Sequence, residues 1–322
     1  MKIYRIPGTD LTVSRLAYGC MRLGGSWGPE PITPEQMQAG HRALEAALDA
    51  GINFFDHADI YGRGKSELVF GELLHGNPGL RERIVIQSKC GIRFPDDPQP
   101  GAPVRYDFSY DHIVRAVEGS LRRLQTDYLD ILLLHRPDAL VEPEEVARAF
   151  DDLQAAGKVR HFGVSNHTAG QIALLSKYLR QAIVANQMQL SLVHHFLISE
   201  GLVANIASDA TVLALGTLDY CRQHDIQIQA WGPVANGRLF KPEVEEALRP
   251  VADLVARLAD EKGVSPDALM LAWLLRHPSG IHPIIGTTRP DRIAASAPAV
   301  DVELTREEWY ALLAAARGRG VP

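Results

Sequence analysis

Eight short apolar runs, separated by polar loops and helical stretches, are the feature that most constrains the fold of this chain. They cover residues 15–18, 52–55, 84–88, 129–134, 159–164, 183–187, 226–230 and 282–285. Near-continuous apolar runs of this length are typical of strands that are buried on both faces of a parallel sheet. Eight strands alternating with helices predict an α/β protein, a closed (β/α)8 TIM barrel, with an open doubly wound sheet as the alternative.

The segments between these runs have apolar residues at helical spacing. We expect helices after Thr33, after Ser265, and at 111–124, 143–156, 169–178 and 213–223. Thr33 and Ser265 each precede a proline, which is a typical way to begin a helix. The chain opens with two apolar runs joined by Pro-Gly-Thr-Asp, which predicts a β-hairpin. Nothing resembling a linker divides the chain, so we expect one domain over 1–322.

Composition narrows the class of protein. Hydrophobic residues make up 46% of the 322 residues and charged residues 22%, and the net charge is −6. A net negative charge gives no general attraction to nucleic acid or acidic membranes. No window approaches ~18 uninterrupted apolar residues, and the N-terminus lacks an apolar signal segment. Cys20, Cys90 and Cys221 form no paired motif, so we expect a reduced, cytoplasmic protein.

The stretch from Asn53 to Glu67, NFFDHADIYGRGKSE, allows three interpretations. A phosphate loop requires a glycine five residues before Gly64, and that position is Asp59. A metal site would use Asp56, His57 and Asp59, but no partner motif occurs elsewhere, so we expect no metal. Lys65-Ser66-Glu67 instead predicts the start of a helix, with Leu68, Phe70 and Leu73 on its apolar face.

Polar side chains recur where the predicted strands end, which is the face of a barrel that carries active sites. The strand ends carry Asp56, Lys89, His135, Ser165, Asn166, Gln187, Trp231 followed by Gly232 and Pro233, and Gly286 followed by Thr287. Asp56 and Tyr61, which follows in the same loop, favour the third interpretation of the stretch, an acid–base site. Reduction of a carbonyl requires hydride at carbon and a proton at oxygen, and a tyrosine can donate that proton.

The motifs at these strand ends resemble those of the aldo-keto reductases over essentially the full chain. They are FFDHADIYG (54–62), QSKCG (87–91), LLLHRPD (132–138), GVSN (163–166), NQMQL (186–190), WGPVANGRL (231–239) and IIGTTRPDRI (284–293). The resemblance implies a (β/α)8 barrel with an N-terminal hairpin and extra C-terminal helices.

The resemblance assigns a catalytic tetrad to Asp56, Tyr61, Lys89 and His135. Tyr61 would be the general acid in reduction. A nearby cation favours the phenolate, so Lys89 is expected to lower the pKa of Tyr61 from about 10. Asp56 would hold Lys89, and His135 would orient the substrate carbonyl. The roles of His57, Cys20 and Cys90 stay open.

The resemblance also implies a nicotinamide dinucleotide bound without a Rossmann fold. Ser165, Asn166 and Gln187 would bind the carboxamide, and Trp231 would stack on the nicotinamide ring. The loop over the pyrophosphate would comprise Gly232, Pro233, Val234, Gly237, Arg238 and Leu239. The expected cofactor-binding residues also include Gly19, Met21 and Asp56. The first strand–helix loop, with Gly19, Cys20, Met21 and Trp27, would also shape the substrate pocket.

The motif 286–292 bears on the choice of cofactor. Gly286, Thr287, Thr288 and Arg292 lie where the family binds the adenosine 2′-phosphate, and Arg289 would add charge. A planar guanidinium suits a phosphate, so NADPH is expected rather than NADH. Many members of the family have lysine at the position of Gly286 and a Glu-Asn pair at Ala295-Ser296, and this chain departs from both.

The expected protein is therefore an NADPH-dependent oxidoreductase that reduces small aldehydes or ketones, as a monomer or weak homo-oligomer. The alternative is a cofactor-binding regulatory or redox-sensing subunit with little turnover. The loop around 91–108 and the connection 191–212 are further candidates for the pocket wall. Arg136 and Asp138 are either partners that support His135 or a surface ion pair.

Overall fold

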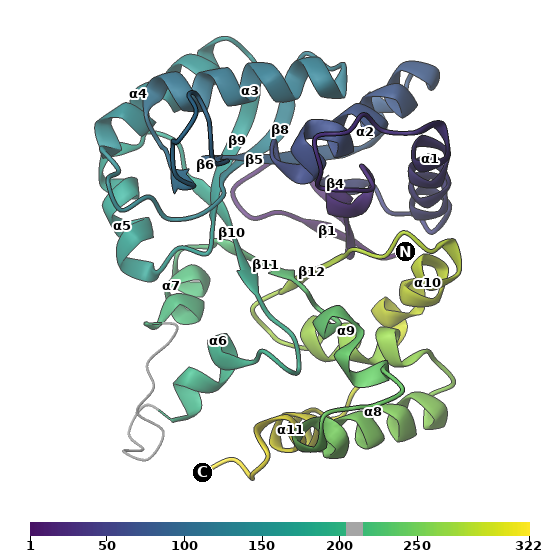
Figure 1. The fold of residues 1–322 in the computed structure, drawn as a ribbon. Coiled ribbons are helices and arrows are strands. Elements are labelled where there is room, and N and C mark those ends of the chain that lie inside the picture. Colours follow the sequence, from purple (N-terminus) through teal and green to yellow (C-terminus); the bar gives the residue numbers. More distant parts are fainter. Residues whose placement is uncertain (204–214) are drawn as a thin grey trace.

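The structure, a computed structural model, describes residues 1–203 and 215–322 (Figure 1). Residues 204–212 of the expected pocket wall and the expected helix start at 213 lie outside the described residues. Eight parallel strands close into a barrel in the order β10-β11-β12-β3-β4-β5-β8-β9, which confirms the predicted TIM barrel over the open sheet. The strands are β3 (Ala17–Gly19), β4 (Phe54–Asp56), β5 (Val85–Cys90), β8 (Leu129–Leu134), β9 (Val159–Ser165), β10 (Ile183–Gln189), β11 (Gln227–Trp231) and β12 (His282–Ile285).

Helices surround the barrel, and the C-terminal ones gather on one side (Figure 1). They are α1 (Pro34–Asp49), α2 (Lys65–Gly76), α3 (Tyr110–Leu124), α4 (Pro143–Ala155), α5 (Ala169–Tyr178), α6 (Phe196–Ser199), α7 (Thr217–Gln223), α8 (Arg249–Glu261), α9 (Pro266–Leu275), α10 (Pro290–Ser296) and α11 (Arg306–Arg317). The Thr33 and Ser265 side chains cap α1 and α9 by accepting hydrogen bonds from backbone amides. Within the described residues, no helix is both long and apolar enough to cross a membrane.

Helix α2 begins at Lys65, as its sequence predicts, but its buried face differs from the predicted one. Phe70 and Leu73 are buried, whereas Leu68 is 40% exposed. Lys65 and Glu67 are instead buried at the start of the helix. Apolar spacing alone placed Leu68 inward, because it cannot reveal that two charged residues of the first turn have buried polar partners.

The N-terminal hairpin covers the end of the barrel at which the parallel strands begin, which we call the lower end. Strands β1 (Ile3–Arg5) and β2 (Thr12–Ser14) pair antiparallel. Apolar hairpin residues, among them Ile6 and Val13, join a buried cluster with the inward-facing residues of the lower barrel, such as Phe54 and Ile131. A separate, larger apolar cluster packs the helices against the outside of the sheet. The lower barrel is thus closed by apolar packing, while the polar strand ends lie at the opposite end.

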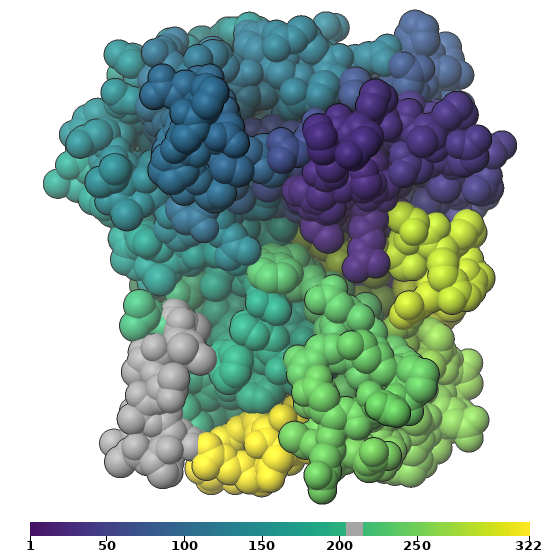
Figure 2. Space-filling view, viewed as in Figure 1, coloured from purple at the N-terminus to yellow at the C-terminus, as the bar shows by residue number. Residues whose placement is uncertain are grey.

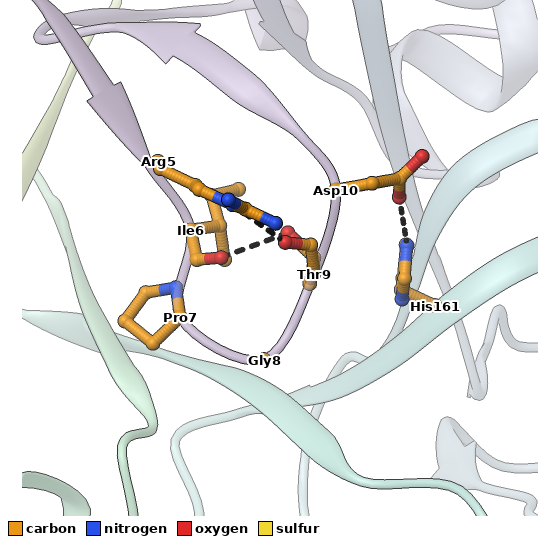
Figure 3. A pocket seen from close by; sticks show the side chains of 7 residues that line it. All are labelled: Arg5, Ile6, Pro7, Gly8, Thr9, Asp10 and His161. Atoms are coloured by element: carbon orange, nitrogen blue, oxygen red, sulfur yellow. Dashed lines mark hydrogen bonds and ion pairs between the residues drawn. The ribbon is translucent and has the colours of Figure 1, made fainter.

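A shallow hollow lies beside the hairpin turn (Figure 3). The turn is held by Thr9, whose hydroxyl donates to the Ile6 carbonyl at 2.8 Å. Asp10, beyond the turn, contacts the ring of His161 at 3.0 Å and also pairs with Arg160. These contacts tie the hairpin to β9.

Asp130 ties three neighbouring segments together at the same end. This buried carboxylate on β8 accepts hydrogen bonds from Arg81 at 2.8 Å, from Arg160 at 2.7 Å and from the Ile86 amide at 2.9 Å. Every donor comes from a different part of the chain, so the carboxylate links β5, β9 and the segment before β5.

We predict that Asp130→Ala lowers the free energy of unfolding by roughly 2–4 kcal/mol, because it removes one acceptor from each of two guanidinium groups and the side-chain acceptor of the buried Ile86 amide. Urea unfolding followed by circular dichroism measures this change. Asp253→Ala, which removes an exposed carboxylate from α8, is the control and should have little effect. Equal effects of the two substitutions would contradict the role given to Asp130.

Candidate active site

The strand registers bring the predicted polar residues to one end of the barrel. Asp56 on β4 is level with Gly19 on β3 and with Gln87 on β5, and Gln187 on β10 is level with Gln229 on β11. A cavity of about 450 Å³ opens at this end, and Asp56, Tyr61 and His135 all line it. In the space-filling view, the purple N-terminal segment and the green segments after β11 approach each other around the middle of this face (Figure 2).

A buried ammonium group forms the centre of the site. Lys89 Nζ donates to Asp56 Oδ2 at 2.8 Å, to the His57 carbonyl at 2.8 Å and to Tyr61 Oη at 2.9 Å. All three possible hydrogen bonds of the ammonium group are therefore made within the protein. Lys89 is 1% exposed and lies behind Tyr61, so it does not reach the cavity surface.

The pKa values of Lys89 and Tyr61 are both raised. Burial opposes the charge of Lys89, but Asp56 and Tyr61 outweigh it and raise the pKa of the ammonium group. Burial also raises the pKa of Tyr61, and the opposing charge of Lys89 does not cancel that effect. The prediction that Lys89 gives Tyr61 a lowered pKa is therefore wrong, because the effect of desolvation exceeds the attraction of the cation. Tyr61 holds its proton at neutral pH.

His135 faces the same space from the end of β8. Its ring centroid lies 5.9 Å from that of Tyr61, in an edge-to-face arrangement. Burial, followed by the charges of Lys89 and Arg136, lowers the pKa of His135 well below its ordinary value. The imidazole is thus uncharged at neutral pH and can exchange a hydrogen bond with a neutral oxygen without adding charge to the cavity.

A layer of buried amides supports Asp56, both from the neighbouring strand β5 and from β10 across the barrel. Asp56 Oδ1 accepts from Gln87 Nε2 at 2.6 Å and from Gln187 Nε2 at 2.9 Å. Gln87 and Gln229 also exchange two hydrogen bonds, at 2.8 and 2.9 Å. Because β5 and β11 lie on opposite sides of the closed barrel, this amide pair spans its interior.

Gln87 and Gln229 are site residues that the sequence reasoning missed. Barrel interiors are usually filled by bulky branched apolar residues. Two glutamines inside predicted buried strands were therefore the available signal, because a buried amide requires partners. Only the packing across the barrel shows that Gln87 pairs with Gln229 and Asp56, and that Gln229 also pairs with Gln187.

The predicted carboxamide-binding residues lie together. Trp231 Nε1 donates to Asn166 Oδ1 at 3.1 Å, and Asn166 Nδ2 donates to Ser165 Oγ at 2.8 Å. The Gln187 amide nitrogen donates hydrogen bonds to Asp56 and to Gln229. Since Gln187 also lines the cavity, its amide oxygen is left to accept a hydrogen bond from a bound group. A free acceptor at this position fits the amino group of a nicotinamide carboxamide.

Most, but not all, of the predicted cofactor positions line the cavity. Those that do are Gly19, Met21, Asp56, Ser165, Asn166, Gln187, Trp231, Gly232, Pro233, Val234, Gly237, Gly286, Thr287 and Arg292. Arg238, Leu239 and Thr288 do not: Arg238 pairs with Glu245 at 2.7 Å, and Leu239 is 4% exposed. Motif position alone could not distinguish these residues from their neighbours. Trp27 and Ile92, from two of the segments expected in the pocket wall, also line the cavity.

The predicted phosphate-binding arginine already has a partner. Arg292 donates to Asp267 Oδ2 through Nε at 3.0 Å and through Nη2 at 2.6 Å. Asp267 follows Pro266 at the start of α9 and lines the same cavity, a position that the sequence reasoning used only as a helix start. Arg289 pairs with Asp291 on the exposed surface. Arg292 is therefore at the cavity, but a phosphate would share it with a carboxylate.

The cavity lining does not include His57, Asp59, Cys20 or Cys90, so the expectation that Cys20 shapes the substrate pocket is wrong. His57 is fully buried against Phe70, and burial and Lys89 lower its pKa to about 3. Its ring nitrogens have no hydrogen-bond partner among the described residues. Asp59 has its pKa raised to about 8, first by burial and then by Glu67. Cys20 and Cys90 are buried thiols. Within the described part of the chain, no group of three or more His, Cys, Asp or Glu residues could hold a metal ion.

Comparison with known proteins adds independent information. The model of the Aldo/keto reductase family matches residues 15–317. A 6-dehydroglucose reductase from Novosphingobium aromaticivorans is 37% identical over 320 residues, which cover 98% of this chain and 95% of that protein. A glycerol dehydrogenase structure from Gluconobacter oxydans has a TM-score of 0.80 at 25% identity and covers 98% of this chain and 95% of its own.

A second solved structure carries ligands. It is an aldo/keto reductase from Klebsiella pneumoniae in complex with NADP and acetate, with a TM-score of 0.72 and 28% identity. The match covers 97% of this chain and 93% of that one.

The amide layer generates a prediction about coupling. Gln87→Leu or Gln229→Leu alone should each lower the free energy of unfolding by about 1–3 kcal/mol, because each leaves buried amide groups without partners. The double substitution should cost less than the sum of the two, since it removes both members of the Gln87–Gln229 pair together. Urea unfolding of the four proteins measures the coupling, and strict additivity would contradict it.

Proposed function

Since the chain belongs to the aldo/keto reductase family, we propose that it reduces aldehydes or ketones to alcohols by hydride transfer from NADPH. The observation that carries this proposal is the contact of Tyr61 with the buried Lys89–Asp56 ion pair at the edge of the cavity. This arrangement can deliver one proton to an oxygen atom in the cavity and can stabilise the negative charge left behind.

Tyr61 would act as the general acid. Because burial raises its pKa, the phenol is protonated before reaction. When it donates, the phenolate formed lies 2.9 Å from the ammonium group of Lys89. A charge-assisted hydrogen bond of this kind is stronger than the neutral one that it replaces, so the donation becomes more favourable. Asp56 would keep Lys89 charged and in position.

His135 would orient the carbonyl. Its neutral imidazole lies beside the Tyr61 ring and lines the cavity. A hydrogen bond from His135 to the substrate oxygen would place that oxygen next to the phenol proton. This role needs no change of charge, which agrees with the lowered pKa of His135.

The chain's own residues would hold the cofactor along the cavity. A bound nicotinamide would supply the hydride. Gln187 would accept from the carboxamide, Trp231 would pack on the ring, and the backbone amides of 232–237 would face the pyrophosphate. Arg292 would meet the 2′-phosphate. The NADP-bound relative from Klebsiella pneumoniae supports this choice of cofactor.

The names of the relatives support the substrate class in outline. The Novosphingobium relative is named a 6-dehydroglucose reductase, and the Gluconobacter relative is named a glycerol dehydrogenase. We propose that the substrate is a small carbonyl compound that carries further oxygen-containing groups. We propose that the protein acts in the cytoplasm as a monomer or weak homo-oligomer.

Tyr61→Phe should lower turnover of NADPH with 4-nitrobenzaldehyde by at least about 100-fold, because it removes the general acid while keeping the ring. NADPH oxidation at 340 nm measures turnover. Binding of NADPH, followed by quenching of protein fluorescence, should survive the substitution.

Unchanged turnover in the variant would contradict the role of Tyr61. Tight NADPH binding by the native protein without turnover of any carbonyl would instead favour the regulatory alternative. A redox-sensing version of that alternative would need an accessible thiol, and Cys20, Cys90 and Cys221 are all buried.

Arg292→Ala should weaken NADPH binding by about 10- to 100-fold and NADH binding far less, because only NADPH has the 2′-phosphate. Fluorescence titration with both cofactors measures the two dissociation constants. Arg292→Ala/Asp267→Asn removes the carboxylate that the single variant leaves unpaired, and Arg289→Ala removes a nearby arginine that is already paired on the surface. Equal weakening of NADPH and NADH in the double variant would contradict the assignment.

A further inference from the structure

Arg136 is a charged residue of the cavity to which the proposed reaction gives no role. It follows His135 directly, is half-buried and lines the cavity together with Tyr61 and Trp231. Its guanidinium carbon lies 5.8 Å from the centre of the Trp231 ring. Its charge also contributes to the lowered pKa of His135. Arg136 is therefore close to the place where a carbonyl would be reduced.

This guanidinium group has no carboxylate partner among the described residues. Asp138, two residues away, is the partner that the sequence offers, but its two oxygens accept from the backbone amides of Leu140 and Phe108, both at 2.9 Å. The surface ion pair considered from the sequence does not form. The carboxylates that line the cavity are also engaged: Asp56 with Lys89, and Asp267 with Arg292.

The carboxylates of the cavity thus leave this charge without a partner among the described residues. The lining also includes the apolar or aromatic residues Trp27, Ile60 and Ile92. A cation half-removed from water among such groups is stabilised when an anion pairs with it, and a face of Trp231 at 5.8 Å compensates only part of that cost. The cofactor's anionic groups would lie elsewhere, along 232–237 and at Arg292.

We propose that Arg136 binds a carboxylate on the substrate, so that the preferred substrates are carbonyl compounds that also carry a carboxylate. The proposal rests on the proposed carbonyl reduction and narrows its substrate class. A guanidinium group can hold a carboxylate through two parallel hydrogen bonds, which fixes orientation as well as affinity. The carboxylate would thereby direct the carbonyl carbon of the same molecule toward the nicotinamide.

The test uses matched pairs of substrates that differ in one charge. The three isomeric carboxybenzaldehydes are compared with their methyl esters at saturating NADPH, and kcat and KM are measured for each. In the native protein, at least one acid should exceed its ester in kcat/KM by about 10-fold or more, mainly through KM. Arg136→Met should remove that preference, so that each acid and its ester have similar kcat/KM values, while Arg136→Lys should keep part of it.

The control is Arg115→Met, which removes the same charge from the exposed surface of α3 and should keep the native preference. Equal kcat/KM values for acids and esters in the native protein, or a preference that persists in Arg136→Met, would overturn the inference while leaving carbonyl reduction intact. Absence of turnover with every acid and ester, despite NADPH binding, would contradict the proposed function itself.

Discussion

The buried ion pair of Lys89 and Asp56 is the interaction on which the upper half of the barrel depends. An ammonium group and a carboxylate taken out of water are costly, and the pair is tolerated only when the remaining hydrogen-bonding capacity is also filled. Here Lys89 makes its other two bonds to Tyr61 and to the His57 carbonyl, and Asp56 receives two amide groups from Gln87 and Gln187. A complete network of this kind is rigid, because each member would lose a partner by moving.

This network joins the parts of the site that need to act together. Tyr61 and Gln187 both contact the same ion pair, one through Lys89 and the other through Asp56. The group proposed to donate the proton and the group proposed to recognise the nicotinamide are therefore held by one set of bonds. Gln229 extends that set by bonding to Gln187 and to Gln87 across the barrel, so the proposed proton donor and the proposed nicotinamide site would be held in place by the same layer of strands.

Sequence patterns predicted the barrel because strand and helix periods alternate without interruption, and each polar strand end then fell on one face. The neighbours Asp56, Tyr61 and Lys89 followed from that topology. Properties that depend on side-chain environment did not follow. The pKa of Tyr61 rises because burial outweighs its cation, and Gln87 and Gln229 acquire meaning only when β5 and β11 meet across the barrel. Arg292 was placed at the cavity, but its pairing with Asp267 joins residues 25 positions apart.

The N-terminal hairpin has a consequence for how ligands enter and leave the cavity. Because its apolar residues close the lower barrel, the described residues give a ligand access to Tyr61 from the end where the strands finish. Cofactor and substrate would then share a single doorway. The ligand that lies deeper in the cavity would then bind first and dissociate last. The hairpin, by closing the lower end of the barrel, would thus determine the order in which cofactor and substrate bind.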